Sequence, residues 1–324
     1  MTGPQRLVHP AAAASASVVS SDFARELLAG LARRPRSVAP KFFYDAAGSA
    51  LFDRICALPE YYPTRTELAL LAAKAGEIAA CMGADAEIVE FGAGSSRKIR
   101  VLLEALKRPQ RFVPIDISAD HLQGAASALR RDFPGLEVLP IGGDFTRPLA
   151  LPAPLGRPRV GFFPGSSIGN FTPDEAVAFL RQVSELLRGG GLLVGVDLVK
   201  DPALLHAAYN DAAGVTADFN LNLLARANRE LGADFDLAAF AHYAFYAPQR
   251  QRIEMHLVSR REQRVHCCGH DFDFAEGDAI HTENSYKYSV DGFRALASQA
   301  GYEPGPAWID AQRLFSIHWL ALPA

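Results

Sequence analysis

An apolar run that ends in a glycine turn places the strongest constraint on how this chain can fold. The segment "EIVEFGAGSSRKIRVLLEAL", residues 87–106, reads as a strand, a tight turn through Gly92 and Gly94, and the start of a helix. Because glycine adopts backbone angles that other residues avoid, such a turn lets the main chain approach a nucleotide-like ligand closely. The segment therefore predicts one strand-turn-helix unit of an α/β fold with a ligand near the turn.

Helical and strand-like segments alternate on both sides of this turn. We expect helices at 66–81, 96–107, 119–131 and 173–187, and strands at 87–91, 111–116, 136–141, 159–163 and 191–197. The segment Thr172-Pro173-Asp174-Glu175 combines a cap, a proline at the first helical position and the glutamate of a capping box. The alternation predicts a doubly wound parallel sheet that is covered by helices on both faces.

A central tract interrupts this alternation. Asp201-Pro202 opens a long helical tract that runs to about Leu231, and strand-like segments follow at 252–260 and 261–267. The pattern returns with one more buried strand at 313–322. We therefore expect an α/β domain at 62–196 plus 287–324 and a second α+β domain at 20–61 plus 197–286. A disordered arm at 1–19 is expected to precede a helix that begins near Ser21-Asp22; a weak signal peptide is the alternative for the arm.

Composition narrows the classes of function. The chain has 324 residues, of which 49% are hydrophobic and 21% charged, as is typical of soluble globular proteins. The net charge of -3 and the lack of a long basic run argue against nucleic acid or an anionic membrane as a partner. No apolar run is long enough to span a bilayer. We expect a monomer.

The four cysteines are Cys56, Cys81, Cys267 and Cys268. They indicate reduced thiols in a cytoplasmic protein, since the last two are adjacent and cannot easily bridge each other. The segment "HCCGH", residues 266–270, has a spacing that matches no common zinc pattern. We expect a strand edge there and no metal.

The residues at the strand ends indicate which ligand the turn binds, because ligands of open parallel sheets lie beyond the carboxyl ends of the strands. Asp116 follows Gly92 by twenty-four positions (116 − 92) and could hold both hydroxyls of a ribose. Asp144 could accept from an exocyclic amine, and Phe145 could lie against a purine. Taken singly, the alternative is that Asp116 and Asp144 only cap turns or helices.

Two common nucleotide signatures are missing from the turn. A dinucleotide fingerprint has a third glycine where this chain has Arg97, and the Gly-Lys-Ser/Thr that closes a P-loop is absent. The strand ends fit S-adenosylmethionine better, since this compound has a ribose and an adenine but no phosphate. Its methionine carboxylate could be bound by the helix start and Lys98.

Several long segments resemble one known family. They are "PKFFYDAAGSALFDRICALPEYYPTRTELALL" (40–71), "FGAGSSRKIRVLLEAL", "PGSSIGNFTPDE", "DLVKDPALLHAAYNDAAGVTADFNLNLL" and "ADFDLAAFAHYAFY...IEMHL". From about residue 20 onward the chain is similar to the L-histidine Nα-methyltransferases of ergothioneine biosynthesis. The resemblance implies a class I methyltransferase domain plus a second domain made of the N-terminal segment and the insertion. It also implies transfer of three methyl groups from S-adenosylmethionine to the α-amino group of histidine, which gives hercynine.

The resemblance also implies which residues bind the substrate. Asn170 and Tyr209 correspond to a clamp on the histidine carboxylate, and as neutral donors they add no charge beside a sulfonium. Tyr44 and Tyr61 correspond to groups that line the amine and imidazole side. Methyl transfer to an amine is an in-line displacement in which positioning dominates, so these contacts must leave the nitrogen free.

The same resemblance implies an imidazole pocket made by Glu283, Ser285 and Met255. The i, i+2 spacing of Glu283 and Ser285 places both on one face of an extended segment. A carboxylate and a hydroxyl can address the two ring nitrogens, and Met255 would supply an apolar wall. Without the resemblance, a tyrosine or methionine in such a stretch is more often ordinary core.

Rival interpretations remain open. The nearest is a methyltransferase of another amino acid such as tryptophan, with the clamp kept and the side-chain pocket changed; the presence of both Glu283 and Ser285 argues against it. A protein that binds S-adenosylmethionine without catalysis is disfavoured by the complete set of substrate residues. A dehydrogenase is disfavoured by Arg97.

Overall fold

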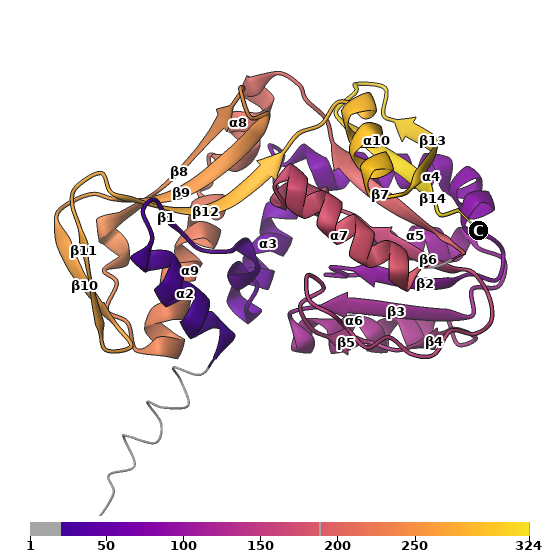
Figure 1. The fold of residues 1–324 in the computed structure, drawn as a ribbon, viewed down its shortest axis with the longest axis horizontal. Coiled ribbons are helices and arrows are strands. Elements are labelled where there is room, and N and C mark those ends of the chain that lie inside the picture. The colour runs from indigo at the N-terminus through magenta and orange to yellow at the C-terminus, as the bar shows by residue number, and fades with distance from the viewer. Residues whose placement is uncertain (1–20, 188, 324) are drawn as a thin grey trace, which may run out of the picture. The chain divides into compact units, whose positions relative to one another are not determined.

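The computed structural model describes residues 21–187 and 189–323, which form two compact units (Figure 1). The large unit comprises Tyr44–Thr216, Ala244–Glu254 and Asn284–Ala324. The small unit comprises the chain up to Phe43, Ala217–Tyr243 and Met255–Glu283. The expected arm at 1–19 lies outside the described residues.

These units differ from the expected domains in four segments. The sequence assigns residues 44–61, 197–216, 244–254 and 284–286 to the second domain, whereas all four segments belong to the large unit. Helix α3 (Ala46–Cys56) packs against helices of the large unit. Leu198 is tied to the same unit because its N–H donates to the carbonyl of Leu314 at 3.1 Å. The expectation that the first 60 residues and the insertion form one substrate-binding domain stays a prediction.

The large unit is built on an eight-stranded sheet in the order β13-β14-β7-β6-β2-β3-β4, with β5 beside β3. Its strands are β2 (Glu87–Phe91), β3 (Arg111–Asp116), β4 (Glu137–Val138), β5 (Ile141–Gly142), β6 (Arg159–Phe163), β7 (Gly191–Asp197), β13 (Glu303–Ile309) and β14 (Phe315–Ala321). The strands β2 to β7 pair in parallel, and β14 runs antiparallel to both β7 and β13. Four expected strands have the expected bounds, and the fifth, 136–141, is split into β4 and β5.

The large unit also contains helices before, between and after these strands. They are α3, α4 (Tyr62–Met82), α5 (Arg97–Ala105), α6 (Ala119–Asp132), η2 (Ser167–Asn170), α7 (Pro173–Leu186), α8 (Pro202–Tyr209) and α10 (Val290–Gln299). Among the described residues, no helix pairs the length with the apolar composition that a membrane crossing needs.

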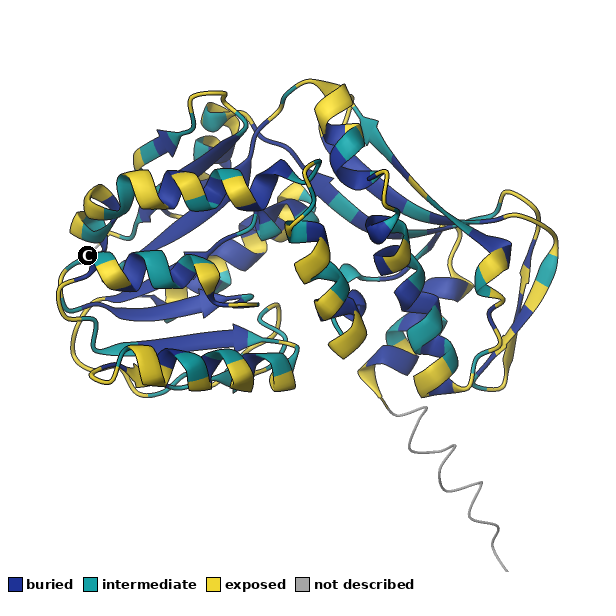
Figure 2. Ribbon diagram, turned by 180° about the vertical axis from the view of Figure 1, so that it is seen from behind, coloured by how far each residue is buried: buried dark blue, intermediate teal, exposed yellow. Residues whose placement is uncertain are grey.

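Side chains alternate between the two faces of the sheet, and a different set of helices covers each face. Val89 and Phe91 of β2 belong to the core that packs against α7 and α10. Ile88, which directly precedes Val89, belongs to the core that packs against α4, α5 and α6. The central strands are therefore buried on both sides, as Figure 2 shows, which explains why they read as continuous apolar runs.

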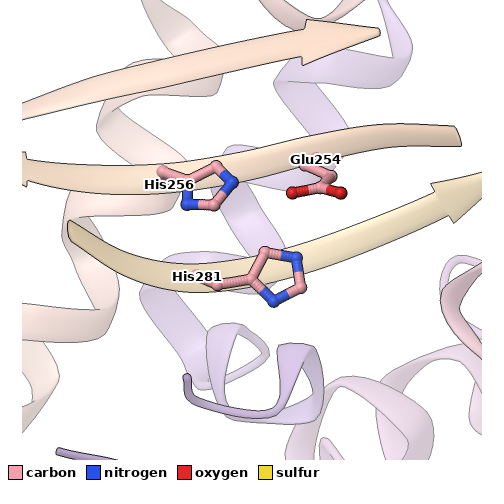
Figure 3. A group of neighbouring side chains, drawn as sticks. All are labelled: Glu254, His256 and His281. Atoms are coloured by element: carbon pink, nitrogen blue, oxygen red, sulfur yellow. The ribbon is translucent and has the colours of Figure 1, made fainter. Parts of the chain in front are cut away.

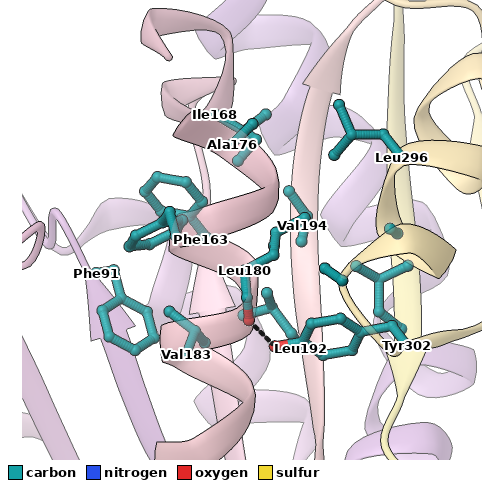
Figure 4. Packing of buried hydrophobic residues seen from close by; sticks show 14 of the residues in the cluster. Phe91, Phe163, Ile168, Ala176, Leu180, Val183, Leu192, Val194, Leu296 and Tyr302 are labelled. Atoms are coloured by element: carbon teal, nitrogen blue, oxygen red, sulfur yellow. Dashed lines mark hydrogen bonds between the residues drawn. The ribbon is translucent and has the colours of Figure 1, made fainter. Parts of the chain in front are cut away.

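Helix α7 shows how the sequence pattern produces this packing. The expected capping box is present, since the Thr172 N–H donates to Glu175 Oε2 at 2.8 Å and the Glu175 N–H donates to Thr172 Oγ1 at 3.4 Å. Ala176, Leu180 and Val183, spaced by four and three residues, face the sheet beside Phe163 and Val194 (Figure 4). The helix thus fixes the loop that precedes it.

The elements not yet described begin with helix α2, which starts at Asp22, where the sequence predicts a helix. They are α2 (Asp22–Ala32), β1 (Arg36–Ser37), η1 (Pro40–Phe43), α9 (Val215–Leu231), η3 (Leu237–Ala239), β8 (Phe240–Ala247), β9 (Arg252–Ser259), β10 (Gln263–Cys267), β11 (His270–Phe274) and β12 (Ala279–Tyr286). Ser21 caps α2 by accepting from the Ala24 N–H at 3.1 Å. A four-stranded sheet has the order β1-β12-β9-β8, and the boundary between the units falls within β8, β9 and β12.

The prediction of a single helical tract from Asp201 to Leu231 is wrong, because the first helix ends at Tyr209. Asp211 accepts from the N–H groups of Val215 and Thr216, both at 2.8 Å, and so caps a new helix, α9. Gly214 precedes it with φ +71°, outside the helical region. The Asp211 carboxylate takes backbone N–H groups that a continuous helix would use for its own hydrogen bonds. Helix-forming composition alone did not indicate this interruption.

The segment "HCCGH" forms the turn of the hairpin β10-β11. Cys267 pairs with His270, and the two residues between them, Cys268 and Gly269, have φ values of +48° and +80°. Two central residues with positive φ are typical of a type I′ hairpin turn. The expected strand edge is therefore a hairpin, and the four cysteines are free thiols.

A buried histidine gives the large unit a testable dependence on pH. Burial, with a smaller contribution from the charge of Arg294, lowers the pKa of His318 to about 4. The unfolded chain protonates this imidazole near pH 6.5. Between these two values the unfolded state binds more protons, so the free energy of unfolding decreases as the pH falls, by at most about 1.4 kcal/mol per pH unit.

We therefore expect His318→Gln to reduce the slope of the free energy of unfolding against pH in this window. Urea unfolding measured at several pH values gives the slope for both proteins. The matched control is His206→Gln, at an exposed position of α8, which should keep the wild-type slope. An unchanged slope in His318→Gln would show that this imidazole does not titrate with unfolding.

Candidate active site

The glycine turn between β2 and α5 holds an unusual backbone shape. Gly92 and Gly94 have φ values of +76° and +48°. The N–H groups of Gly92 and Ala93 donate to the carbonyl of Ile115 at 2.9 and 3.1 Å. The sheet order reverses here, because β3 lies on one side of β2 and β6 on the other. The turn therefore lies at the switch point where α/β sheets bind ligands.

Asp116 joins this turn to the end of β3. Its Oδ2 accepts from the Gly94 N–H at 3.0 Å, and its Oδ1 accepts from the Ser118 N–H at 2.9 Å. The carboxylate thus supports the glycine turn as well as the start of the next helix. A ligand role for Asp116 stays a prediction.

Asp144 and Phe145 follow β5. Asp144 Oδ1 accepts from the N–H and the hydroxyl of Thr146, at 2.9 and 2.5 Å, so this carboxylate caps a turn. The ring of Phe145 packs against Phe91 and Phe163 with centroids 6.5 and 5.6 Å apart. A side-chain carbon placed on Gly92 would lie 3.5 Å from the Phe145 ring, so this glycine and this aromatic ring are neighbours.

Lys98 forms an ion pair with a buried carboxylate. Its Nζ lies 2.6 Å from Oε2 of Glu67 on α4, and both oxygens of Glu67 also accept from the Gly165 N–H at 3.0 Å. A side-chain carbon at Gly195 would come within 2.1 Å of Glu67 Oε1, so only glycine fits there. Through Glu67, Lys98 is therefore held near Gly165, which follows β6, and near Gly195 of β7.

A second buried acid lies just before the glycine turn. Glu90 is 1% exposed, and its Oε2 has no hydrogen-bond partner among the residues that the structure describes. Burial, joined by the charge of Asp116 and that of Glu67, raises the pKa of Glu90 well above its ordinary value, although Lys98 acts against this. An unsatisfied buried carboxyl beside a turn at the switch point fits a site that accepts a polar ligand.

A connected polar network lies at the end of β7. The Tyr209 hydroxyl lies 2.7 Å from Ser285 Oγ, and Lys287 Nζ lies 2.8 Å from Ser285 Oγ and 3.2 Å from the Tyr209 hydroxyl. The same Lys287 forms an ion pair with Asp197 at 2.7 Å. The structure therefore brings together Tyr209 and Ser285, which the sequence singled out separately.

Asp197 extends the network toward α4. The Tyr62 hydroxyl donates to both carboxylate oxygens of Asp197, at 2.9 and 2.8 Å, and Lys200 Nζ lies 2.6 Å from Oδ1. Burial acts to raise the pKa of Asp197, but Lys287 and Lys200 outweigh it and the pKa is lowered. The carboxylate is therefore ionised and paired with two cations.

Aromatic rings lead from the N-terminal part of the large unit to this network. The ring centroids of Tyr44 and Phe52 are 5.6 Å apart, those of Phe52 and Tyr61 are 6.3 Å apart, and those of Tyr61 and Tyr209 are 6.5 Å apart. All three pairs are edge-on. Four residues are expected at the amine and carboxylate of the substrate. Three of them, Tyr44, Tyr61 and Tyr209, thus belong to one series of aromatic contacts, and the fourth is Asn170.

Asn170 ends the short helix η2. The preceding Gly169 approaches the backbone of Tyr286 so closely that a side-chain carbon there would lie 2.7 Å from the Tyr286 carbonyl. Ser166 anchors the same loop, because its Oγ accepts from the Asp197 N–H at 2.9 Å. These contacts place Asn170 on a loop that is packed against the strand residue next to Ser285.

Met255 and Glu283 lie in the small unit, where they are 1% and 9% exposed. The Met255 carbonyl accepts from Thr282 Oγ1 at 3.1 Å, so Met255 lies beside the residue that precedes Glu283. Glu283 and Ser285 are two positions apart on β12 and therefore share a face of that strand, as expected.

Two histidines and a glutamate lie close together on the neighbouring strands β9 and β12 (Figure 3). The ring centroids of His256 and His281 are 5.0 Å apart, and ligand atoms of Glu254, His256 and His281 all lie within 4.8 Å of one another. Glu254 Oε1 also accepts from Nε and Nη2 of Arg252, at 2.8 and 2.6 Å. The guanidinium therefore competes with any cation for this carboxylate.

Sequence reasoning missed the rest of the polar network, namely Tyr62, Asp197, Lys200 and Lys287. Two signals pointed to it. Asp197 ends the strand expected at 191–197, and strand ends are where ligands of such sheets bind. Lys287 continues the i, i+2 series of Glu283 and Ser285.

The parallel strands, the antiparallel β14 between β7 and β13, and the glycine turn at the switch point define a class I methyltransferase fold with a second α+β part. A profile of the family described as "Histidine-specific methyltransferase, SAM-dependent" matches residues 23–322. The chain belongs to this family of S-adenosylmethionine-dependent enzymes.

Named relatives agree with this assignment. The chain is 45% identical to a histidine N-alpha-methyltransferase of Mycolicibacterium smegmatis, over 90% of this chain and 92% of that protein. It is 30% identical to ergothioneine biosynthesis protein 1 of Neurospora crassa, over 89% of this chain and 33% of that protein. It is 25% identical to a 4-dimethylallyltryptophan N-methyltransferase of Aspergillus fumigatus, over 90% and 91%.

Proposed function

We propose that this protein transfers three methyl groups from S-adenosylmethionine to the α-amino group of L-histidine, giving hercynine for ergothioneine biosynthesis. The observation that carries the proposal is the family match over residues 23–322, joined by 45% identity to a histidine N-alpha-methyltransferase. The site geometry supports it, because Tyr209 and Ser285, the residues assigned to the carboxylate and to the imidazole, lie 2.7 Å apart.

In this proposal the methyl donor binds at the glycine turn. Gly92 and Gly94 let it approach the backbone, Asp116 accepts from its ribose hydroxyls, and Asp144 and Phe145 hold its adenine. Lys98, paired with Glu67, provides positive charge near its methionine carboxylate. The donor supplies a methyl group on a sulfonium, and the chain supplies only its binding and orientation.

The histidine is held at both ends so that its nitrogen stays free. Asn170 and Tyr209 clamp the carboxylate, Tyr44 and Tyr61 line the amine, and the side chain is read by a separate pocket. That pocket consists of Met255, Glu283 and Ser285. Because the α-amine must attack as the neutral base, aromatic walls that exclude water favour the reactive form.

A second candidate is methylation of another amino acid. The likeness to a 4-dimethylallyltryptophan N-methyltransferase favours it, since that relative matches over 90% of this chain. The carboxylate clamp would serve tryptophan equally well. Glu283 and Ser285 favour histidine, because an indole offers a single N–H and no ring acceptor.

The test is to incubate the purified protein with S-adenosylmethionine and L-histidine and to follow the products by mass spectrometry. We expect mono-, di- and trimethylated histidine, with all methyl groups on the α-nitrogen by NMR. Nα-acetyl-histidine keeps the imidazole but blocks the amine, so it should give no product. Methylation of the ring, or of tryptophan in preference to histidine, would contradict the proposal.

A further inference from the structure

Two buried lysines share a single carboxylate at the end of β7. Asp197 is 1% exposed, and its Oδ1 lies 2.6 Å from Lys200 Nζ while its Oδ2 lies 2.7 Å from Lys287 Nζ. The side chains of the two lysines are 5% and 1% exposed, and all three residues belong to the large unit. Because water reaches so little of this group, its charges act on their surroundings with little screening.

The charges of this group do not cancel. Burial acts to lower the pKa of Lys287, but Asp197 outweighs it and the pKa is raised. Burial lowers the pKa of Lys200 to about 8, with Asp197 opposing this effect and Lys287 adding to it. At pH 7 two protonated lysines therefore face one ionised carboxylate, which leaves one excess positive charge.

The other ionisable groups that face the two lysines do not remove this excess at pH 7. Asp310 also acts on Lys200, but more weakly than Asp197 does, and its oxygens accept from backbone N–H groups at positions 312, 314 and 315. Burial raises the pKa of the neighbouring tyrosines Tyr62, Tyr246 and Tyr288, which therefore stay neutral.

The excess charge lies beside a residue that is expected to bind the substrate. Lys287 Nζ lies 3.2 Å from the Tyr209 hydroxyl oxygen and 5.0 Å from the centre of its ring. A phenol oxygen can accept from an ammonium group while its own hydrogen is donated elsewhere. A carboxylate oxygen bonded to Tyr209 would therefore lie at most about 6 Å from the Lys287 ammonium, given a usual O–H···O distance of about 2.7 Å.

We propose that Asp197, Lys200 and Lys287 select the class of substrate, because their excess positive charge is matched by the α-carboxylate of a free amino acid. The inference rests on the proposed function, in which Tyr209 holds this carboxylate. Amines, amides and esters that carry the same side chain bring no matching charge and are bound less tightly. The two lysines act as positioning residues, since their charge reaches the carboxylate through Tyr209, which itself stays neutral.

The experiment compares two ligands that lack the α-amine, imidazolepropionate and its primary amide. Both keep the imidazole and the chain length of histidine, and neither can be methylated on an α-nitrogen. Their affinities are measured by isothermal titration in the presence of S-adenosylmethionine. At pH 7 we expect the wild-type protein to bind the acid about tenfold more tightly than the amide. Equal affinities would overturn the inference.

The preference for the acid should decrease at alkaline pH. Above about pH 8 Lys200 loses its proton, so the excess charge disappears and the carboxylate is attracted less strongly. We expect the ratio of the two affinities to fall about threefold between pH 7 and about pH 9.5. Lys200→Arg keeps its charge in this range and should keep the ratio constant. A constant ratio in the wild-type protein, or the same fall in Lys200→Arg, would overturn the inference.

Neutral variants separate the two lysines at pH 7. We expect Lys287→Met to weaken binding of the acid about tenfold and that of the amide by less than about twofold. Lys200→Met removes the more distant charge and should lower the ratio about threefold. The control is Lys74→Met, at an exposed position of α4, which should keep the wild-type ratio. Equal losses for acid and amide would show a purely structural role and overturn the inference.

The test does not depend on the folding of the methionine variants. If they do not fold, the pH dependence of the wild-type protein and of Lys200→Arg decides, since both proteins retain the buried charges. Failure of the proposed function looks different from failure of this inference. In the former case the wild-type protein binds S-adenosylmethionine but gives no methylated histidine, whereas in the latter histidine is methylated and acid and amide bind equally.

Discussion

Glu283→Ala is expected to lower the affinity for histidine by about one to two orders of magnitude. Glu283 is 9% exposed on β12, so removal of its carboxylate leaves a ring N–H of the substrate without a partner in a mostly buried position. A charge-assisted hydrogen bond of this kind contributes about 1.5–3 kcal/mol. The affinity is measured by isothermal titration with the methyl donor present.

The same change should move the preference toward larger aromatic side chains. It opens space and removes a charge, while Asn170 and Tyr209 still hold the carboxylate of the substrate. We therefore expect kcat/KM for tryptophan to rise relative to that for histidine. The control is Glu276→Ala, at an exposed turn position before β12, which should leave the ratio unchanged. If Glu283→Ala keeps the wild-type ratio, Glu283 does not read the imidazole.

Asp116→Ala is expected to weaken S-adenosylmethionine binding by about 1–3 kcal/mol, because two ribose hydroxyls lose a charged acceptor. The structure adds a second contribution, since Asp116 also accepts from the Gly94 N–H at 3.0 Å and so supports the glycine turn. Asp120→Ala, at an exposed position in the first turn of α6, is the matched control and should bind normally. Wild-type affinity in Asp116→Ala would refute the assignment of this site.

Asp116→Asn separates the two contributions. The amide keeps one oxygen for a backbone N–H but loses the charge that favours the ribose hydroxyls. A loss close to that of Asp116→Ala would assign the effect to the ligand. Near-normal binding in Asp116→Asn, with weak binding in Asp116→Ala, would assign it to the shape of the turn.

The sheet was predictable from sequence because its signals are local. The buried strands at 87–91, 111–116, 159–163 and 191–197 appear at the expected bounds, since apolar runs between turn residues determine them. The Thr172 and Glu175 capping box likewise involves neighbours three positions apart. The break between α8 and α9 was missed because it depends on how one side chain, Asp211, competes for backbone donors.

The candidate site was only partly predictable. Glycines and acids at strand ends indicated the methyl-donor side, and the family resemblance supplied the substrate residues, whose ligand roles stay predictions. Nothing local indicates that Lys287 pairs with Asp197 or that Tyr62 joins them, because these residues are 90 (287 − 197) and 135 positions apart. Burial of a charge becomes visible only when the folded chain shows what it is paired with.

The buried network around Asp197 also acts as a check on how the chain assembles. Its members come from α4, β7 and the segment after β12, so the carboxylate can leave water only after distant parts of the chain have met in the correct register. A collapsed but misassembled chain would bury this charge without its partners, at a cost of several kcal/mol. Desolvation thus penalises wrong arrangements more than it rewards the right one, and assembly of the network around Asp197 becomes conditional on a correctly formed sheet.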